Sequence, residues 1–192
     1  SRIVPESGKE ASFTFNPIEY AVKDVGTHTY IVREAKGQIP GVTYDETEYT
    51  ITVEVVDDGK GSLIATQTIE AEGQKADEVA FANIYEATGE LALTAVKTVN
   101  GGAPAENQVF SFTLSDENGE IETVENKLGE ITFSTLNYTL ADLGTHTYTV
   151  RETNTDGDGL TVDTTVYTVT VEVKDAGDGT LTVTASDNAT AL

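Results

Sequence analysis

The sequence predicts an all-β protein built from two immunoglobulin-like sandwiches in tandem. Apolar and polar residues alternate in short segments rich in threonine, valine and tyrosine, as expected for half-buried strands. Turns rich in Asp, Asn and Gly separate these segments, and the whole pattern occurs twice. Strands at this spacing over roughly a hundred residues favour an immunoglobulin-like sandwich.

The two copies are an internal duplication of one domain-sized unit. Residues 13–61 align without a gap with residues 131–179, a shift of 118 positions, and 25 of the 49 positions are identical. A period of this length is that of a domain rather than of a solenoid repeat. We therefore expect domains at residues 1–87 and 88–192, with a junction that carries one glycine and has little linker freedom.

Each copy lacks one terminal part of the aligned unit. Residue 1 corresponds to residue 119, so the first copy is expected to be the C-terminal part of a sandwich. Residue 192 corresponds to residue 74, so the second copy is expected to lack its last strand. The chain also has no methionine, and we interpret it as a piece of a longer protein. A sandwich without one strand exposes an edge, which favours strand donation from another chain.

The composition excludes several classes of function. The chain has 33 Asp+Glu and 11 Lys+Arg, a net charge of −22, so neither nucleic acid nor an anionic membrane surface is an expected partner. Cysteine is absent, which excludes disulfides and thiol chemistry. No run of eighteen apolar residues occurs, so membrane insertion is not expected. This composition is typical of an extracellular bacterial protein.

Clear alternation predicts eight strands, at residues 12–16, 27–34, 49–56, 91–99, 109–114, 145–152, 167–173 and 181–185. Polar residues interrupt some of the inward rows. Glu34 and its repeat counterpart Glu152 each end an apolar row. Lys97 lies among aliphatic residues, and Asn83 lies between aromatic ones. Because an unpaired buried polar group is costly, each of these side chains is expected to have a partner.

A lysine, a glutamate and an asparagine that meet in a core can form a covalent crosslink. Loss of solvent disfavours both charges, so the proton can sit on the carboxyl group rather than on the amine. The neutral amine then attacks the asparagine amide carbon, the glutamic acid polarises the carbonyl, and ammonia leaves. Fixed neighbours supply proximity, and a core poor in water suppresses hydrolysis. The reaction occurs once within the fold, so the chain is not predicted to be an enzyme.

The sequence resembles the isopeptide-linkage domains of Gram-positive pilins and adhesin stalks. The resemblance rests on Ala-Val-Lys-Thr-Val at 95–99, Tyr-x-Val-Arg-Glu at 30–34 and 148–152, and Phe-Ala-Asn-Ile-Tyr at 81–85. It implies sandwiches of the Cna-B/pilin type in which a first-strand lysine, matched by Lys97, joins a last-strand asparagine, matched by Asn83. Glu34 and Glu152 match the acid/base residue, and no cofactor is implied.

The three residue types are divided between the two copies. The first copy holds Glu34 and Asn83, and the second holds Lys97 and Glu152. We therefore expect another chain, or residues outside this sequence, to complete each site. Asn188 lies near the C-terminus but lacks the Phe-x-Asn-x-Tyr setting, which makes it a poor substitute.

Two further features have plain structural explanations. Each copy has one histidine, His28 or His146, whereas a zinc site needs three or four converging ligands, so no metal site is expected. The Asp/Gly loops lack the ligand register of an EF-hand and are predicted to be hairpin turns.

The predicted function is structural. We expect a domain of a stalk or pilus shaft on the cell wall of a Gram-positive bacterium, with isopeptide crosslinks that resist force and proteolysis. Its partners would be neighbouring repeats or chains of the same surface protein. The alternative is an adhesin module that binds a host protein or glycan through its loops. Loops 37–41 and 155–159 differ between the copies, which is compatible with binding and equally with drift.

Overall fold

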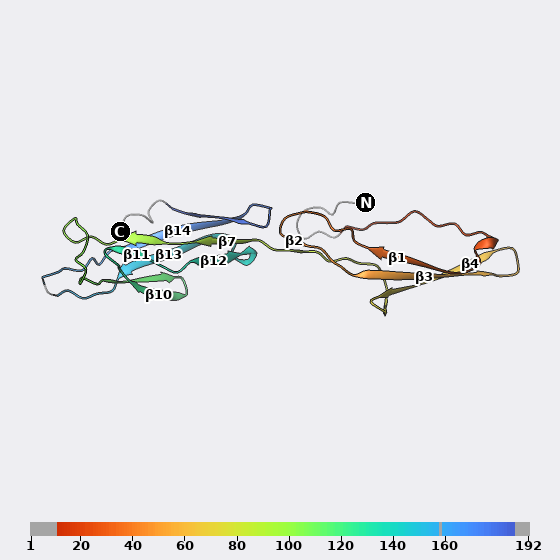
Figure 1. The fold of residues 1–192 in the computed structure, drawn as a ribbon, viewed down its shortest axis with the longest axis horizontal. Helices are drawn as coiled ribbons and strands as arrows, with labels where there is room; N and C mark the ends of the chain where they lie inside the picture. The colour runs from red at the N-terminus through yellow and green to blue at the C-terminus, as the bar shows by residue number, and fades with distance from the viewer. Residues whose placement is uncertain (1–10, 158, 187–192) are drawn as a thin grey trace. The chain divides into compact units, whose positions relative to one another are not determined.

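The computed structural model describes residues 11–157 and 159–186 (Figure 1). The chain divides into two compact units, unit 1 at residues 1–85 and unit 2 at residues 86–192. Nearly all of the regular structure is strand, which confirms the predicted fold class of tandem immunoglobulin-like domains. The helical elements described are two single 3₁₀ turns, η1 (Val22–Asp24) and η2 (Leu140–Asp142). Neither turn approaches the length or apolar character that a membrane-spanning helix requires.

Unit 2 is built on a five-stranded antiparallel sheet with the order β10-β9-β13-β14-β15. Two short strand pairs, β7 with β12 and β8 with β11, complete the sandwich. Its strands are β7 (Thr88–Leu91), β8 (Thr94–Val96), β9 (Ser111–Asp116), β10 (Gly119–Glu125), β11 (Glu130–Thr132), β12 (Leu136–Thr139), β13 (Gly144–Glu152), β14 (Val166–Asp175) and β15 (Leu181–Ala185).

The core of unit 2 comes from both parts of the sandwich. Leu114 and Val171 on the large sheet and Ile131 on β11 are each 0% exposed. Complete burial of such side chains contributes about 1.5–3 kcal/mol each to folding. The inward row of β13 includes Tyr148 and Val150, as the alternation predicts, and it ends at Glu152. The core therefore extends up to the polar residue that the sequence singled out.

Unit 1 has a four-stranded antiparallel sheet with the order β1-β3-β4-β5, and a separate pair of β2 with β6. Its strands are β1 (Gly26–Arg33), β2 (Val42–Thr43), β3 (Glu48–Asp57), β4 (Leu63–Ala71), β5 (Gln74–Ala76) and β6 (Ile84–Tyr85). The pairing of β1 with β3 starts at Gly26 opposite Val55, and that of β13 with β14 starts at Gly144 opposite Val173. Both residues of the second pair lie 118 positions after those of the first, so the two copies share the same strand register as well as similar sequences.

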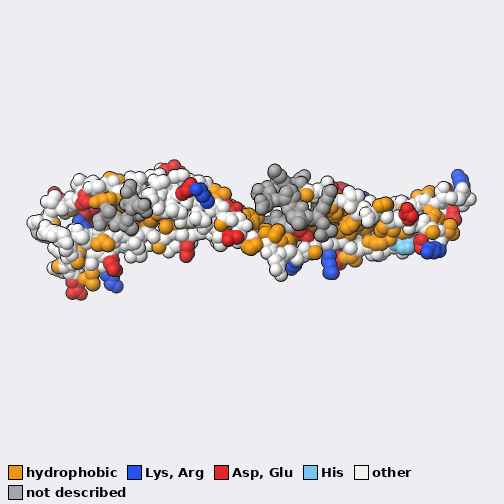
Figure 2. All heavy atoms as spheres, turned by 90° about the horizontal axis from the view of Figure 1, so that it is seen from above, with side chains coloured by type: hydrophobic (Ala, Val, Ile, Leu, Met, Phe, Trp, Pro, Cys, Tyr) orange, Lys and Arg blue, Asp and Glu red, His pale blue; other side chains and the backbone are white. Residues whose placement is uncertain are grey.

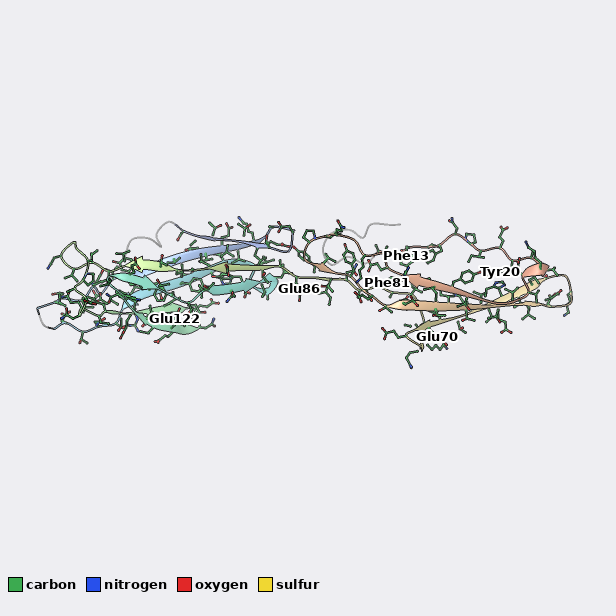
Figure 3. All side chains as sticks on the ribbon, in the orientation of Figure 1. Phe13, Tyr20, Glu70, Phe81, Glu86 and Glu122 are labelled. Atoms are coloured by element: carbon green, nitrogen blue, oxygen red, sulfur yellow. The ribbon has the colours of Figure 1, made fainter. Side chains whose placement is uncertain are left out.

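The predicted strand at residues 12–16 is wrong. The equivalent residues of unit 2 include β11, which pairs with β8, and the described residues of unit 1 include no counterpart of β8. Residues 12–16 pair with no strand in the described part of the chain, and Phe13 (Figure 3) and Phe15 are 44% and 63% exposed. Their counterparts Ile131 and Phe133 are 0% and 3% exposed.

Unit 1 therefore has a much smaller buried core than unit 2. Of the eighteen buried hydrophobic residues in the described part of the chain, three lie in unit 1, namely Tyr49, Val53 and Val55. Figure 2 shows hydrophobic side chains at the surface of this unit, on the right of the view. The sheet of unit 1 has the right sequence to be one half of a sandwich, but the described residues cover little of its apolar face.

One predicted strand is divided, and the segment that carries Asn83 is mostly not strand. The segment 91–99 is not one strand, because the chain changes its partner from β12 to β11 between β7 and β8. The alternation of exposure nevertheless continues through Leu93, Ala95 and Lys97. In the segment 79–85, only Ile84–Tyr85 pairs with another strand. Alternation in sequence thus marked the inward side chains more accurately than it marked the strand ends.

The Asp/Gly loops form turns closed by their own carboxylates. Gly59 N–H donates to Asp57 Oδ1 at 2.8 Å, and Gly177 N–H makes the equivalent 2.8 Å bond to Asp175 Oδ1. Gly59 and Gly177 both have positive φ, at 70° and 77°, a region in which glycine is favoured. These bonds support the interpretation of the loops as hairpin turns.

Equivalent phenylalanines in the two units are expected to contribute very differently to stability. Phe133→Ala should lower the free energy of unfolding of unit 2 by about 3–5 kcal/mol, because it leaves a cavity in a packed core. Phe15→Ala changes a mostly exposed side chain and should alter the stability of unit 1 by less than about 0.5 kcal/mol. Chemical denaturation of both variants measures the difference. Equal losses would show that Phe15 is packed as well as Phe133.

Candidate crosslinking site

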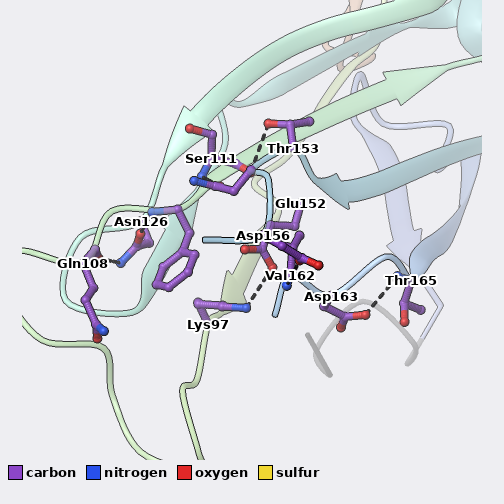
Figure 4. Close-up of polar contacts among 12 residues, drawn as sticks. Lys97, Gln108, Ser111, Asn126, Glu152, Thr153, Asp156, Val162, Asp163 and Thr165 are labelled. Atoms are coloured by element: carbon purple, nitrogen blue, oxygen red, sulfur yellow. Dashed lines mark hydrogen bonds and ion pairs between the residues drawn. The ribbon is translucent and has the colours of Figure 1, made fainter. Parts of the chain in front are cut away.

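Lys97 and Glu152 meet in unit 2. Lys97 directly follows β8, where its backbone N–H donates to the Gly129 carbonyl at 2.7 Å, and Glu152 is the last residue of β13. Lys97 Nζ donates to Glu152 Oε2 at 2.8 Å (Figure 4). The two side chains are 13% and 2% exposed. The amine also lies 4.7 Å from the centre of the Phe110 ring. The ends of β8 and β13 thus place the Lys97 amine and the Glu152 carboxylate in contact at the margin of the core.

Asn83 and Glu34 meet in unit 1. Asn83 lies just before β6, and its Nδ2 donates to Glu34 Oε1 at 2.8 Å. Its carbonyl oxygen, Oδ1, accepts a 2.8 Å bond from the Asp45 backbone N–H, so Glu34 contacts the amide nitrogen and not the carbonyl that it was expected to polarise. The expectation that Asn83 occupies an inward row is only partly right, because the residue is exposed although its amide reaches the glutamate. In unit 2 the equivalent glutamate is covered by Lys97, which has no counterpart in the described part of unit 1.

The two glutamates use their carboxylates in complementary ways. In unit 1 the carboxylate binds the asparagine amide, and in unit 2 it binds the lysine amine. The second oxygen of each, Glu34 Oε2 and Glu152 Oε1, is buried without a hydrogen-bond partner. A buried acceptor in this state costs about 1–3 kcal/mol. In each unit the carboxylate therefore has one bonded oxygen and one buried oxygen without a partner.

A repeated Asp-x-Thr-x-Tyr motif lies beside Glu152 in unit 2 and binds the Asn83 segment in unit 1, and sequence analysis missed it. In unit 2, Asp163 Oδ1 accepts from the Thr165 N–H at 2.9 Å and Oδ2 accepts from the Tyr167 hydroxyl at 2.8 Å. Hydrogen bonds from Thr165 are the main reason that the pKa of Asp163 lies below its usual value of 3.8. The bond to Asp163 is the main cause that raises the pKa of Tyr167. The identity of all three positions in both copies was the available signal.

The same motif holds the asparagine segment in unit 1. Asp45 Oδ1 accepts from the Thr47 N–H and Oδ2 accepts from the Ala82 N–H, both at 2.8 Å. The Tyr49 hydroxyl donates to the Ala80 carbonyl at 2.6 Å. The Tyr49 ring packs edge-on against Phe81 with a centroid distance of 5.4 Å. The motif therefore contacts every residue from 80 to 83.

Unit 2 has a small cavity beside Glu152 and Asp163, the counterparts of the two residues that bind Asn83 in unit 1. The cavity has a volume of about 30 Å³ and is lined by Val96, Lys97, Phe112, Glu152, Asp163 and Tyr167. Pockets for drug-sized molecules are about 300–1,000 Å³. This space suits one side chain rather than a cofactor or a substrate.

The histidines take structural positions. His28 Nε2 lies 2.7 Å from the Asp24 carbonyl oxygen, and His146 Nε2 lies at the same distance from that of Asp142. Both rings pack at a tilt against a tyrosine of their own unit. Within residues 11–157 and 159–186, no three His, Cys, Asp or Glu side chains converge as metal ligands would.

Comparison with known proteins identifies the family of the chain. The family model for FctA, described as a Spy0128-like isopeptide containing domain, matches residues 2–86 and 93–191. The chain therefore belongs to this family of isopeptide-containing domains. Among solved structures, an asparagine-to-alanine mutant of the major pilin from Streptococcus pyogenes is similar at 21% identity, over 84% of this chain and 69% of that chain, with a TM-score of 0.32. No significant match is found among curated proteins.

Removal of one partner from the buried pair is expected to destabilise unit 2. Glu152→Ala leaves the Lys97 amine without its carboxylate and should cost about 3–5 kcal/mol. The double variant Lys97→Met with Glu152→Leu should cost less, since it leaves no buried charge. Glu172→Ala breaks an exposed pair with Lys174 and should cost less than about 1 kcal/mol. Denaturant unfolding distinguishes these cases, and equal effects of Glu152→Ala and Glu172→Ala would contradict the burial argument.

Acid is expected to release the asparagine segment from unit 1. The hydrogen bonds of Thr47 and Ala82 lower the pKa of Asp45 from its usual value of 3.8. A depressed folded pKa contributes stability that is present above the unfolded value and is lost as the pH falls through the folded value. The protection factor of the Ala82 amide in hydrogen exchange should therefore stay constant down to about pH 4 and fall below it.

Asp45→Asn is the control for this pH dependence. The amide side chain does not titrate. In this variant the protection factor of the Ala82 amide should therefore not fall below about pH 4 as it does in the unsubstituted chain. Protection that stays unchanged to about pH 2 in the unsubstituted chain would contradict the role of the carboxylate.

Proposed function

We propose that this chain is a structural part of a surface stalk or pilus shaft, stabilised by autocatalytic Lys–Asn isopeptide crosslinks. One observation carries the proposal. The same glutamate position binds the nucleophile Lys97 in unit 2 and the acceptor Asn83 in unit 1, and each carboxylate keeps one buried oxygen without a partner. Membership of the isopeptide-containing family supports it.

In a complete unit the glutamate would lie between the lysine and the asparagine. A proton moves from Nζ to the carboxylate along a hydrogen bond of the kind seen between Lys97 and Glu152, at 2.8 Å. The neutral amine attacks the asparagine Cγ, and a new C–N bond forms. The glutamic acid passes its proton to the original amide nitrogen, that C–N bond breaks as the carbonyl reforms, and ammonia leaves. The carboxylate takes up the second proton of the attacking nitrogen, so the new amide keeps one hydrogen and the glutamate ends protonated. Glu34 and Glu152 are thus the acid/base residues, and the residues present require no cofactor or metal.

The burial of the pair supports this chemistry. The Glu152 side chain is 2% exposed, and the adjacent Phe110 ring shields the amine. An amide is a weak electrophile, and the held geometry supplies the effective concentration that makes its reaction with an amine feasible. Exclusion of water limits competing hydrolysis.

The mechanical benefit follows from which strands are joined. A bond between the first and the last strand carries tension through covalent bonds, so the strands between them need not separate. Closing a loop of about a hundred residues contributes roughly 4–5 kcal/mol in the chain-entropy model. Slow unfolding also limits access by proteases, which is the form of stability that an exposed surface protein needs.

The proposed partners are neighbouring repeats or chains of the same surface protein, and the proposed location is the cell wall of a Gram-positive bacterium. Membership of the isopeptide-containing family supports both. The strand that completes unit 2 would come from further residues of the same protein or, by strand donation, from another chain. In unit 1 the asparagine segment is held by Asp45 and Glu34, so its donation would first require its release.

An extended chain tests the crosslink directly. Residue 192 aligns with residue 74, so a second copy of residues 75–86 placed after Leu192 completes unit 2 in the register of the repeat. The intact mass of this chain should be lower than the calculated mass by one ammonia, and fragmentation should locate the bond at Lys97. Lys97→Met, Glu152→Gln, and alanine in place of the appended asparagine should each restore the full calculated mass. Full mass in the unsubstituted extended chain would refute the proposal.

A further inference from the structure

We infer that Asp163 and Tyr167 form a docking clamp for the asparagine strand of unit 2. Before the strand binds, the Tyr167 hydroxyl donates to the Asp163 oxygen that later accepts a strand N–H. This inference deepens the proposed function and rests on it. Asp163 would receive the strand backbone through its side chain and the asparagine carbonyl through its own backbone N–H. Tyr167 would move its hydrogen bond from Asp163 to the strand.

Unit 1 shows the clamp in its occupied state. One carboxylate oxygen of Asp45 accepts the Ala82 N–H at 2.8 Å, and the Asp45 backbone N–H donates to the Asn83 carbonyl oxygen at 2.8 Å. A single residue therefore fixes both the strand backbone and the reactive amide. The Tyr49 hydroxyl adds a third bond, to the Ala80 carbonyl at 2.6 Å.

In unit 2, no described residue makes the bonds to Asp163 that the asparagine strand makes to Asp45. Asp163 keeps the bond from Thr165, which corresponds to the bond between Thr47 and Asp45 in unit 1. The oxygen that holds a strand N–H in unit 1 here accepts the Tyr167 hydroxyl, at 2.8 Å. The same tyrosine position thus has two acceptors, the strand carbonyl when the strand is present and the aspartate when it is not.

The cavity of unit 2 lies beside this clamp. Asp163 and Tyr167 share its lining with Lys97 and Glu152. Figure 4 shows Asp163 on the segment that runs alongside the Lys97 and Glu152 pair. An asparagine entering this space, held as Asn83 is in unit 1, would place its carboxamide between the Asp163 N–H and Glu152 and next to the Lys97 amine.

The backbone N–H of this aspartate has a chemical role as well as a positional one. When the lysine amine attacks Cγ, negative charge develops on the asparagine carbonyl oxygen, which accepts the Asp45 N–H in unit 1. A fixed N–H donor aimed at such an oxygen lowers the barrier, and removal of one such donor typically costs about 10²–10³ in rate. The Asp163 N–H is therefore the proposed oxyanion donor, and the Asp163 side chain positions the strand against it.

The rate of ammonia loss in the extended chain described above tests the positioning role. Asp163→Ala should slow the reaction about 10- to 100-fold, because it lets the strand shift relative to the amine. Asp163→Asn keeps an oxygen that can accept the strand N–H, and it should recover part of the rate. Asp178→Ala is the matched control. Asp178 makes similar bonds to the residue two positions on, Thr180, in a hairpin turn outside the cavity lining, and its loss should leave the rate unchanged.

A second measurement follows the tyrosine without any reaction. The Lys97→Met form of the extended chain cannot crosslink, so it reports docking alone. The ¹³Cζ resonance of Tyr167, assigned by its loss in Tyr167→Phe, should shift when the appended strand is present, because the hydroxyl exchanges a carboxylate acceptor for a carbonyl. The same resonance in the 192-residue chain with Lys97→Met is the reference.

The outcomes separate this inference from the proposed function. Ammonia loss that is equally fast in Asp163→Ala and the parent overturns the clamp and leaves the crosslink proposal standing. If the parent loses no ammonia, the crosslink proposal fails, and the Tyr167 resonance still decides on the clamp. A shifted resonance supports the clamp, and an unchanged one overturns it. The resonance test also stands if Asp163→Ala does not fold.

Discussion

The structure depends on a carboxylate buried at the end of an apolar strand row. Glu34 and Glu152 end the inward rows that begin in β1 and β13, and in both units one oxygen is bonded and the other has no partner. An unsatisfied acceptor in a core is unfavourable, and a protein keeps one where it serves chemistry or awaits a partner. The lysine, the asparagine and the Asp-x-Thr-x-Tyr motif are all arranged around this one group.

The requirement that every strand has a neighbour explains why two similar sequences have such different cores. Residues 130–132 form β11 because β8 lies beside them, whereas the equivalent residues of unit 1 belong to no sheet. Phe15 is 63% exposed, and the described residues of unit 1 include no counterpart of Lys97 beside Glu34. The two units thus act as natural controls for each other, one showing the lysine side of the proposed site and the other the asparagine side.

Much of the candidate site could be predicted from single residues, because a charged or amide side chain in an apolar row is conspicuous. Lys97, Glu34 and Glu152 lie where alternation placed them. Asp163 and Tyr167 could not be found in this way, because an aspartate followed by threonine is just as typical of an ordinary turn as of a binding site. Their roles depend on which backbone groups lie opposite, and only the folded chain of unit 1 places the Ala82 N–H against Asp45.

The sequence by itself determined the all-β class, the duplication and its register, and the division of the lysine and asparagine between the copies. These follow from local alternation and from identity between the copies, which need no knowledge of distant contacts. The tertiary structure decided which alternating segments became strands, where the strand at 91–99 divides, and which oxygen of each carboxylate is bonded. Those outcomes depend on hydrogen-bond partners far away in the sequence, and no local pattern records whether such a partner is present.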